Sequence, residues 1–204
     1  MKTIFDHLLK ISNNYKETVD DLAQDCDLDG RRDYLYADEI KAQRVQERNS
    51  KFNKLVDRAA EEAAERAMPE IGKLRERLKQ YVTSSSNPAA MQTLQALLAG
   101  GVELSSAELA AFAEGADYAT LRLLEKPSGG HIQAPSLADM EKDVKELAAH
   151  FRSLRAYRGA IAGASTEIFW GMPAPVGSKI QEGMLTHFPE KLDAMQQRWA
   201  ILER

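Results

Sequence analysis

Apolar side chains recur at steps of three and four positions along the first 24 residues, with polar side chains between them. The recurring positions are Ile4, Leu8, Ile11, Tyr15, Val19 and Leu22. This spacing places all of them on one side of an α-helix, so we predict a helix over residues 2–24. The next six residues, DCDLDG, are Asp and Gly types that favour turns over helix interiors. We therefore predict a break in the chain at 25–30.

A second, longer helical pattern runs from about Arg32 to Val82. Its first part, 38–51, has few large apolar residues and is not expected to pack deeply along its length. Pro69 predicts either a kink near Met68 or two separate helices. The second part has an apolar stripe close to coiled-coil spacing, through which we predict self-association. The stripe consists of Phe52, Val56, Ala59, Ala63, Ala67, Ile71, Leu74, Leu78 and Tyr81.

Shorter helical patterns follow residue 87. Asn87 and Pro88 suit a helix start, and the pair Gly100 and Gly101 suits its end. Ser105 and Glu108 have the spacing of a capping box, and DYATLRLLEK is a third short helix. Two amphipathic helices come later. Their apolar stripes are Leu137, Met140, Val144, Leu147, Phe151 and Leu154, and then Met184, Leu185, Phe188, Leu192, Met195, Trp199 and Leu202.

These patterns predict an all-α fold, because no segment shows the alternation typical of strands. We expect a long N-terminal helical hairpin or coiled-coil-like arm over 1–83. A small C-terminal helical bundle is expected over 88–204, with an apolar loop rich in Gly and Pro at 159–178.

Composition narrows the class of protein. The 204 residues are 44% hydrophobic and 28% charged, which is globular, and no apolar run reaches the roughly 18–20 residues of a membrane helix. The single cysteine, Cys26, excludes an intrachain disulfide and a cysteine-based zinc site. We expect an intracellular location or a place within a larger particle, without a secretion signal. The net charge of −4 argues against a generally basic nucleic-acid binder.

The acidic stretch at 25–33 resembles the EF-hand calcium-binding loop over nine residues. Carboxylates on alternate residues of such a loop converge on a hard cation, and a glycine at its sixth position permits the sharp turn. The matching residues here are Asp25, Asp27, Asp29, Gly30 and, at the ninth position, Asp33. The resemblance implies a Ca²⁺ site with Asp25, Asp27, Asp29 and Asp33 among its ligands.

The twelfth position departs from the EF-hand pattern. Tyr36 stands where the family has a bidentate Glu, and Arg31 and Arg32 bring positive charge beside the ion. A capped turn between two helices, with the aspartates near backbone N–H groups, is therefore the preferred interpretation. Calcium binding is kept as an alternative function.

A row of basic residues suggests a second alternative, nucleic-acid binding. Over 41–58, six basic residues recur at three- and four-residue steps and could contact phosphates from one helix face: Lys41, Arg44, Arg48, Lys51, Lys54 and Arg58. Glu47 lies between them and no aromatic platform accompanies them, so a solvated charged face is preferred.

The segment EIFWGMPAPVG (167–177) is a candidate anchor for a partner protein. Aromatic and Met side chains are enriched at interface hot spots, and the segment offers Phe169, Trp170 and Met172. The preferred interpretation, however, is that Phe169 and Trp170 fill the helical core from a connecting loop. No motif for a nucleophile, a phosphate loop or a metal catalyst is evident, so we expect neither an enzyme nor a small-molecule substrate.

The leading hypothesis is a non-catalytic helical structural or assembly protein that acts through protein–protein contacts or self-association. A virus- or prophage-encoded structural accessory is one setting we consider, although no residue motif supports it.

Overall fold

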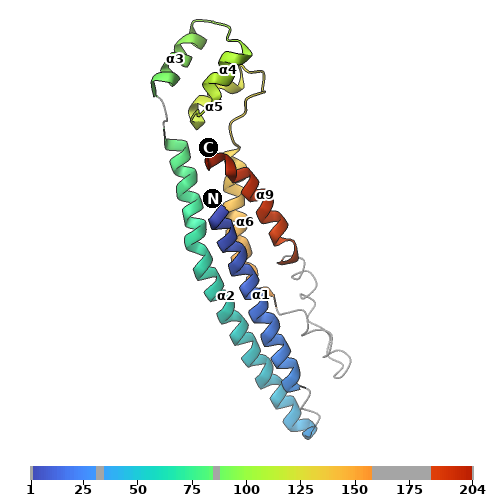
Figure 1. Ribbon diagram of the computed structural model, residues 1–204. Coiled ribbons are helices and arrows are strands. Elements are labelled where there is room, and N and C mark those ends of the chain that lie inside the picture. The colour runs from blue at the N-terminus through green and yellow to red at the C-terminus, as the bar shows by residue number, and fades with distance from the viewer. Residues whose placement is uncertain (1, 31–34, 85–87, 158–184, 204) are drawn as a thin grey trace.

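The computed structural model describes residues 2–30, 35–84, 88–157 and 185–203, and no strand occurs among them. The fold is all-α, as predicted. Two long antiparallel helices, α1 (Lys2–Gly30) and α2 (Asp38–Thr83), pack together as a hairpin, and α2 extends past the start of α1 toward the opposite end of the molecule (Figure 1). A smaller helical part follows them along the chain.

The predicted break at 25–30 is wrong, because α1 continues through this stretch to Gly30. The second helix also begins later than predicted, at Asp38 rather than near Arg32. Asp and Gly lower helix stability by at most about 1 kcal/mol each, whereas each added residue of an existing helix gains a backbone hydrogen bond. The preference of DCDLDG for a turn was therefore overridden, and Gly30 is the last residue of the helix.

Pro69 lies inside α2 and does not divide it, so the two-helix alternative is wrong. The residue is exposed. Proline removes the hydrogen bond to the carbonyl four residues earlier, here that of Glu65, which is also an exposed residue. Water can satisfy that carbonyl, and this lowers the cost of keeping proline within the helix.

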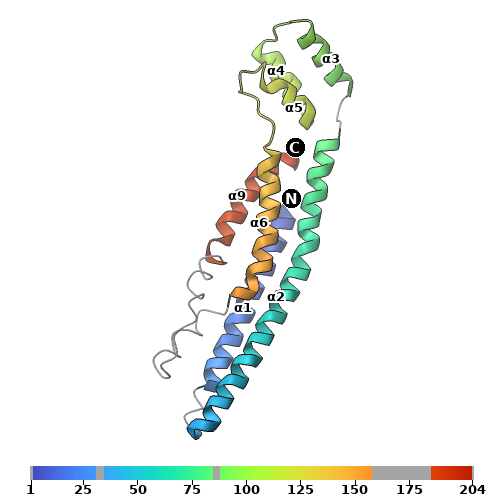
Figure 2. The same cartoon turned by 180° about the vertical axis from the view of Figure 1, so that it is seen from behind.

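The main core forms where two further helices pack against one half of the hairpin (Figures 1 and 2). These are α6 (Leu137–Ser153), extended by the 3₁₀ turn η2 (Leu154–Ala156), and α9 (Phe188–Trp199), extended by η3 (Ala200–Glu203). The described residues of both predicted stripes face this core, whereas Met184 lies outside the described residues. The largest fully buried side chains of the core include Trp199, Phe5, Phe151, Ile71 and Leu74.

The α2 stripe predicted to mediate self-association is for the most part buried inside a single chain. Val56, Ala63, Ala67, Ile71, Leu74 and Leu78 belong to the main core. They are covered by α1, α6 and η2, which all contact α2. The prediction that this stripe joins two copies is therefore wrong, because helices from the same chain already cover it.

A second, smaller core lies at the end of the molecule opposite the hairpin turn (Figure 1). It joins α3 (Pro88–Ala99), α4 (Ser106–Ala113) and α5 (Tyr118–Glu125) around Leu94, Leu109 and Leu124. The hydrophobic contacts thus place α3–α5 in one cluster, and α6 and α9 in the other with the hairpin.

Local capping residues set the end of α3 and the start of α4, as predicted, whereas the predicted cap Asn87 lies outside the described residues. Gly101 has a φ of 71°, and the N–H groups of Gly101 and Val102 donate to the carbonyls of Leu98 and Leu97, which is a Schellman motif. Both bonds of the Ser105–Glu108 capping box are present. The hydrogen bonds from the Ser105 side chain and backbone lower the pKa of Glu108.

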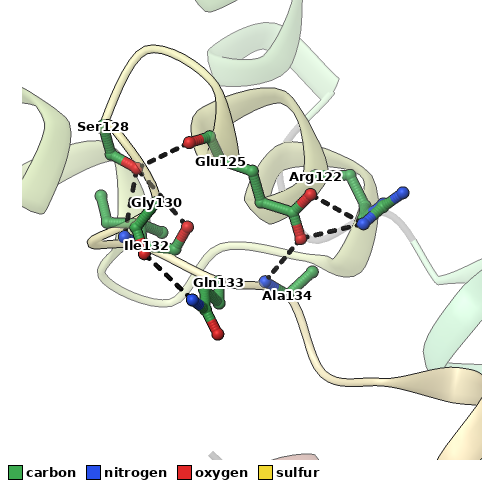
Figure 3. Close-up of polar contacts among 7 residues, drawn as sticks. All are labelled: Arg122, Glu125, Ser128, Gly130, Ile132, Gln133 and Ala134. Carbon is green, nitrogen blue, oxygen red and sulfur yellow. Dashed lines mark hydrogen bonds and ion pairs between the residues drawn. The ribbon is translucent and has the colours of Figure 1, made fainter.

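Side-chain hydrogen bonds hold the connection from α5 to α6 (Figure 3). Glu125 accepts from the Arg122 guanidinium at 2.7 Å and from the backbone N–H of Ala134 at 3.1 Å. The Ser128 hydroxyl donates to the Glu125 carbonyl at 3.1 Å and accepts from the N–H of Ile132. This turn closes onto α5 and leads the chain back to the main core.

Candidate protein-interaction site

Large apolar side chains are exposed at the turn of the α1–α2 hairpin. We call this group the tip cluster, and it consists of Leu28 (49% exposed), Leu35 (68%), Tyr36 (41%) and Ile40 (52%). An exposed apolar patch is informative because single scattered apolar residues are normal on a surface but grouped ones mark interaction sites. The tip cluster is therefore the candidate site for a protein partner.

The described helices leave the tip uncovered. The described parts of α6 and α9 lie beside the other half of the hairpin, and the tip extends beyond them (Figures 1 and 2). No residue of α2 from Ile40 to Leu55 is buried, and the first buried one is Val56. This agrees with the prediction that 38–51 is not deeply packed. The tip is thus held by the α1–α2 contact alone among the described helices.

One contact orients an aromatic ring of the tip cluster. The guanidinium of Arg44 lies 4.3 Å from the centroid of the Tyr36 ring. Such a cation–π contact contributes about 0.5–1 kcal/mol at an exposed site. It holds the residues just before α2 against the first turns of that helix, so Tyr36 presents a defined surface.

The predicted basic face lies on α2 beside the tip cluster. Arg44 and Lys51 are exposed, whereas Lys41 and Arg48 are half-buried. Glu47 interrupts the row and accepts a hydrogen bond from Gln43 at 2.9 Å. The row therefore mixes charges and Arg44 is already in contact with Tyr36. Nucleic-acid binding by this face stays a prediction that no contact in the structure favours.

The predicted calcium ligands lie in a different setting from the one expected. Asp25 and Asp29 are exposed on the last turns of α1, which also includes Asp27, and Asp33 lies outside the described residues. Within the described residues no group of three acidic, histidine or cysteine side chains could hold a metal. Calcium binding stays a prediction.

The predicted partner anchor at Phe169, Trp170 and Met172 lies outside the described residues, as does the whole of the loop at 159–178. Among the described residues, the tip cluster is the exposed apolar surface suited to a protein partner. Sequence reasoning missed the cluster because Leu28, Leu35 and Ile40 fit no stripe. Large apolar residues outside every helical stripe were the signal in the sequence that could have identified the tip cluster.

A buried polar network, also missed from sequence, joins α6 to α9. The Asp143 carboxylate accepts from Arg198 at 2.9 and 3.1 Å and from the indole N–H of Trp199 at 3.0 Å. Hydrogen bonding to Asp143 raises the pKa of Arg198, and the Asp143 side chain is only 4% exposed. This network fixes the rotation of α9 against α6, which is a structural role.

A buried histidine marks the junction of α1, α6 and α9. The His150 ring stacks on Phe188 with the centroids 3.6 Å apart, and its Nε2 lies 3.3 Å from the Ser12 hydroxyl. Burial, and then the charge of Lys191, lowers the pKa of His150 to about 4. The ring is therefore neutral at pH 7 and acts as a core residue.

No protein-family model, curated protein or solved structure matches this chain. In the described part of the chain, no helix has both the length and the apolar character needed to cross a bilayer.

Proposed function

We propose that this protein is a non-catalytic helical structural or assembly component, and that the tip cluster is a surface through which it contacts other protein. The observation that carries the proposal is the grouping of four large exposed apolar side chains, Leu28, Leu35, Tyr36 and Ile40, at one end of a long hairpin. The arm separates this surface from the two cores, so a partner can approach it without disturbing either core.

The energetics favour an assembly with several contacts over a single tight contact. Fully burying one large apolar side chain contributes roughly 1.5–3 kcal/mol, and these four are about half exposed already. One tip cluster therefore supplies roughly 3–6 kcal/mol, whereas association costs at least about 4 kcal/mol in lost freedom of motion. A single contact of this size is weak, and stable assembly requires that contacts be repeated between copies.

The proposal is tested by site-specific photo-crosslinking in the cells that make the protein. A benzophenone amino acid in place of Leu35 lies at the most exposed position of the tip cluster. We expect it to form a covalent product with a second copy or with another protein. The same amino acid in place of Arg66, an exposed residue elsewhere on α2, is the matched control and should form none.

Substitutions within the tip cluster distinguish a loss of partner contact from a loss of folding. Because Leu35 and Ile40 are exposed, Leu35→Ser with Ile40→Ser should change the free energy of unfolding by less than about 0.5 kcal/mol each. In this double variant, a benzophenone amino acid at position 28 should form no crosslinked product, while the circular dichroism melt is unchanged. Absence of any product from position 35, or an unchanged product in the double variant, contradicts the proposed role of the tip.

A further inference from the structure

A second surface, far from the tip, lies between the end of α2 and the start of α6. It is a groove of about 470 Å³. Its apolar lining comes from Leu78, Val82, Leu137 and Val144, of which Val82 is 41% exposed. Among its described lining residues the groove includes neither the tip cluster nor the basic face predicted on α2.

The two helices present matching stripes to the groove. Arg75, Leu78, Lys79 and Val82 recur at three- and four-residue steps on α2, as Leu137, Glu141, Val144 and Lys145 do on α6. The helices run antiparallel (Figures 1 and 2). Two neighbouring helices with a shared apolar floor form the trough in which a third helix packs in helical bundles.

The charges along the groove are predominantly positive. Three cations, Arg75, Lys79 and Lys145, line it together with one anion, Glu141, in a protein whose net charge is −4. Within the described residues none of the three cations forms an ion pair or hydrogen bond. Long basic side chains beside an apolar floor are complementary to carboxylates that flank an apolar helix face.

We propose that this groove binds an acidic amphipathic helix of a partner protein. Leu or Met side chains of the helix would cover Val82 and Leu137, and flanking Glu or Asp side chains would pair with Arg75, Lys79 and Lys145. Among the described residues the apolar floor on α6 runs from Leu137 to Val144, about 10 Å of helix, which is shorter than an extended acyl chain and favours a helix over a lipid. This surface is independent of the tip cluster and so is its test.

The test measures binding of a fluorescein-labelled peptide by anisotropy. The peptide is an amphipathic helix of about 20 residues with Leu on one face and Glu beside it, and its twin has Lys at every Glu position. We expect the Glu peptide to bind the full chain with a Kd on the order of 10–100 µM, and the Lys peptide to bind at least about tenfold more weakly.

Variants of the protein locate the binding. Lys79→Glu should weaken the Glu peptide at least about tenfold, and Val82→Ser should weaken both peptides. Arg66→Glu makes the same change in net charge on the far side of α2, nine residues from Arg75, and should leave the affinity unchanged.

Three outcomes overturn the proposal. The first is no binding of the Glu peptide, and the second is equal affinity for the Glu and Lys peptides. The third is an affinity for the Glu peptide that Lys79→Glu leaves unchanged. Sodium oleate that binds wild type where the Glu peptide does not would instead assign the groove to a small anionic amphiphile.

Discussion

Buried polar residues set much of the specificity of this core. His150 is flat against Phe188 and edge-on to Phe151, with ring centroids 3.6 and 5.2 Å away, so a proton on its ring enters an apolar site. The pKa of His150 is lowered to about 4, whereas an unfolded chain has the ordinary value near 6.5. Below pH 6.5 the unfolded state therefore binds a proton that the folded state excludes.

The stability should consequently fall as the pH falls from 6.5 to about 4, and this contribution is complete above pH 6.5. The full loss from His150 is on the order of 3 kcal/mol, from about 1.4 kcal/mol per unit of pKa. Urea unfolding at pH 7.0, 5.5 and 4.5 measures it. His150→Gln should have a shallower pH dependence over this range than wild type. Equal slopes for the two proteins would show that other groups carry the effect.

The Asp143 network predicts that one substitution lowers the free energy of unfolding. Asp143→Ala leaves the buried indole N–H of Trp199 without its acceptor, which costs about 1–3 kcal/mol in the free energy of unfolding. Asp193→Ala, at an exposed position of α9, is the control and should change it by less than about 0.5 kcal/mol. Chemical denaturation measures both. If Asp143 formed only a surface ion pair, Asp143→Ala and Asp193→Ala would have similar free energies of unfolding.

At the scale of the helices, α2 is a single element with two environments. From Val56 onward its apolar side chains are buried by α1, α6 and η2, whereas from Ile40 to Leu55 none is buried. The same hydrogen-bonding pattern therefore has different stabilities in the two halves, because local opening is governed by the apolar contacts that must be broken.

Hydrogen exchange read by mass spectrometry should resolve this difference. Amides of α2 over 42–54 are expected to exchange before those over 60–78. Amides of α1 over 22–30 should exchange about as fast as those over 42–54. If the tip cluster binds protein as proposed, the faster half becomes protected in the assembled state. Uniform protection along α2 in the free protein would contradict the expectation.

At the scale of the whole molecule, the described residues form two cores of unequal size. Three buried leucines, Leu94, Leu109 and Leu124, hold α3–α5 together, while the main core joins α1, α2, α6 and α9. A tilted contact between Tyr81 and Tyr118, with ring centroids 6.0 Å apart, links the smaller unit to α2. So small a core should open without unfolding the rest.

Leu124→Ala tests whether the two cores are separable. The change creates a cavity costing about 2–5 kcal/mol, and we expect faster hydrogen exchange in α3–α5 with protection in α6 and α9 unchanged. Leu147→Ala, in the main core, should reduce protection in α1, α2, α6 and α9 together. Loss of protection throughout the chain in Leu124→Ala would show one cooperative unit.

Local patterns in the sequence were enough to predict the all-α class, the stripes of α6 and α9, and the ends of α3 and α4. Each depends on side chains within one or two turns of each other, such as Ser105 with Glu108, or on the 3.6-residue period itself. Such interactions are present in the helix before it packs, so they can be read without knowing the fold.

Only the tertiary structure decided what covers each apolar face. The period of the α2 stripe shows which side is apolar but not whether α6 or a second copy will lie against it. His150 contacts Ser12 across 138 positions of the chain, and Asp143 contacts Arg198 across 55. At such separations along the chain, the spacing of two residues does not indicate whether they are close in space. The tip cluster and the groove beside Val82 are likewise defined by what the packed helices leave uncovered. Burial is a property of the assembled helices, which is why these surfaces emerged only from the fold.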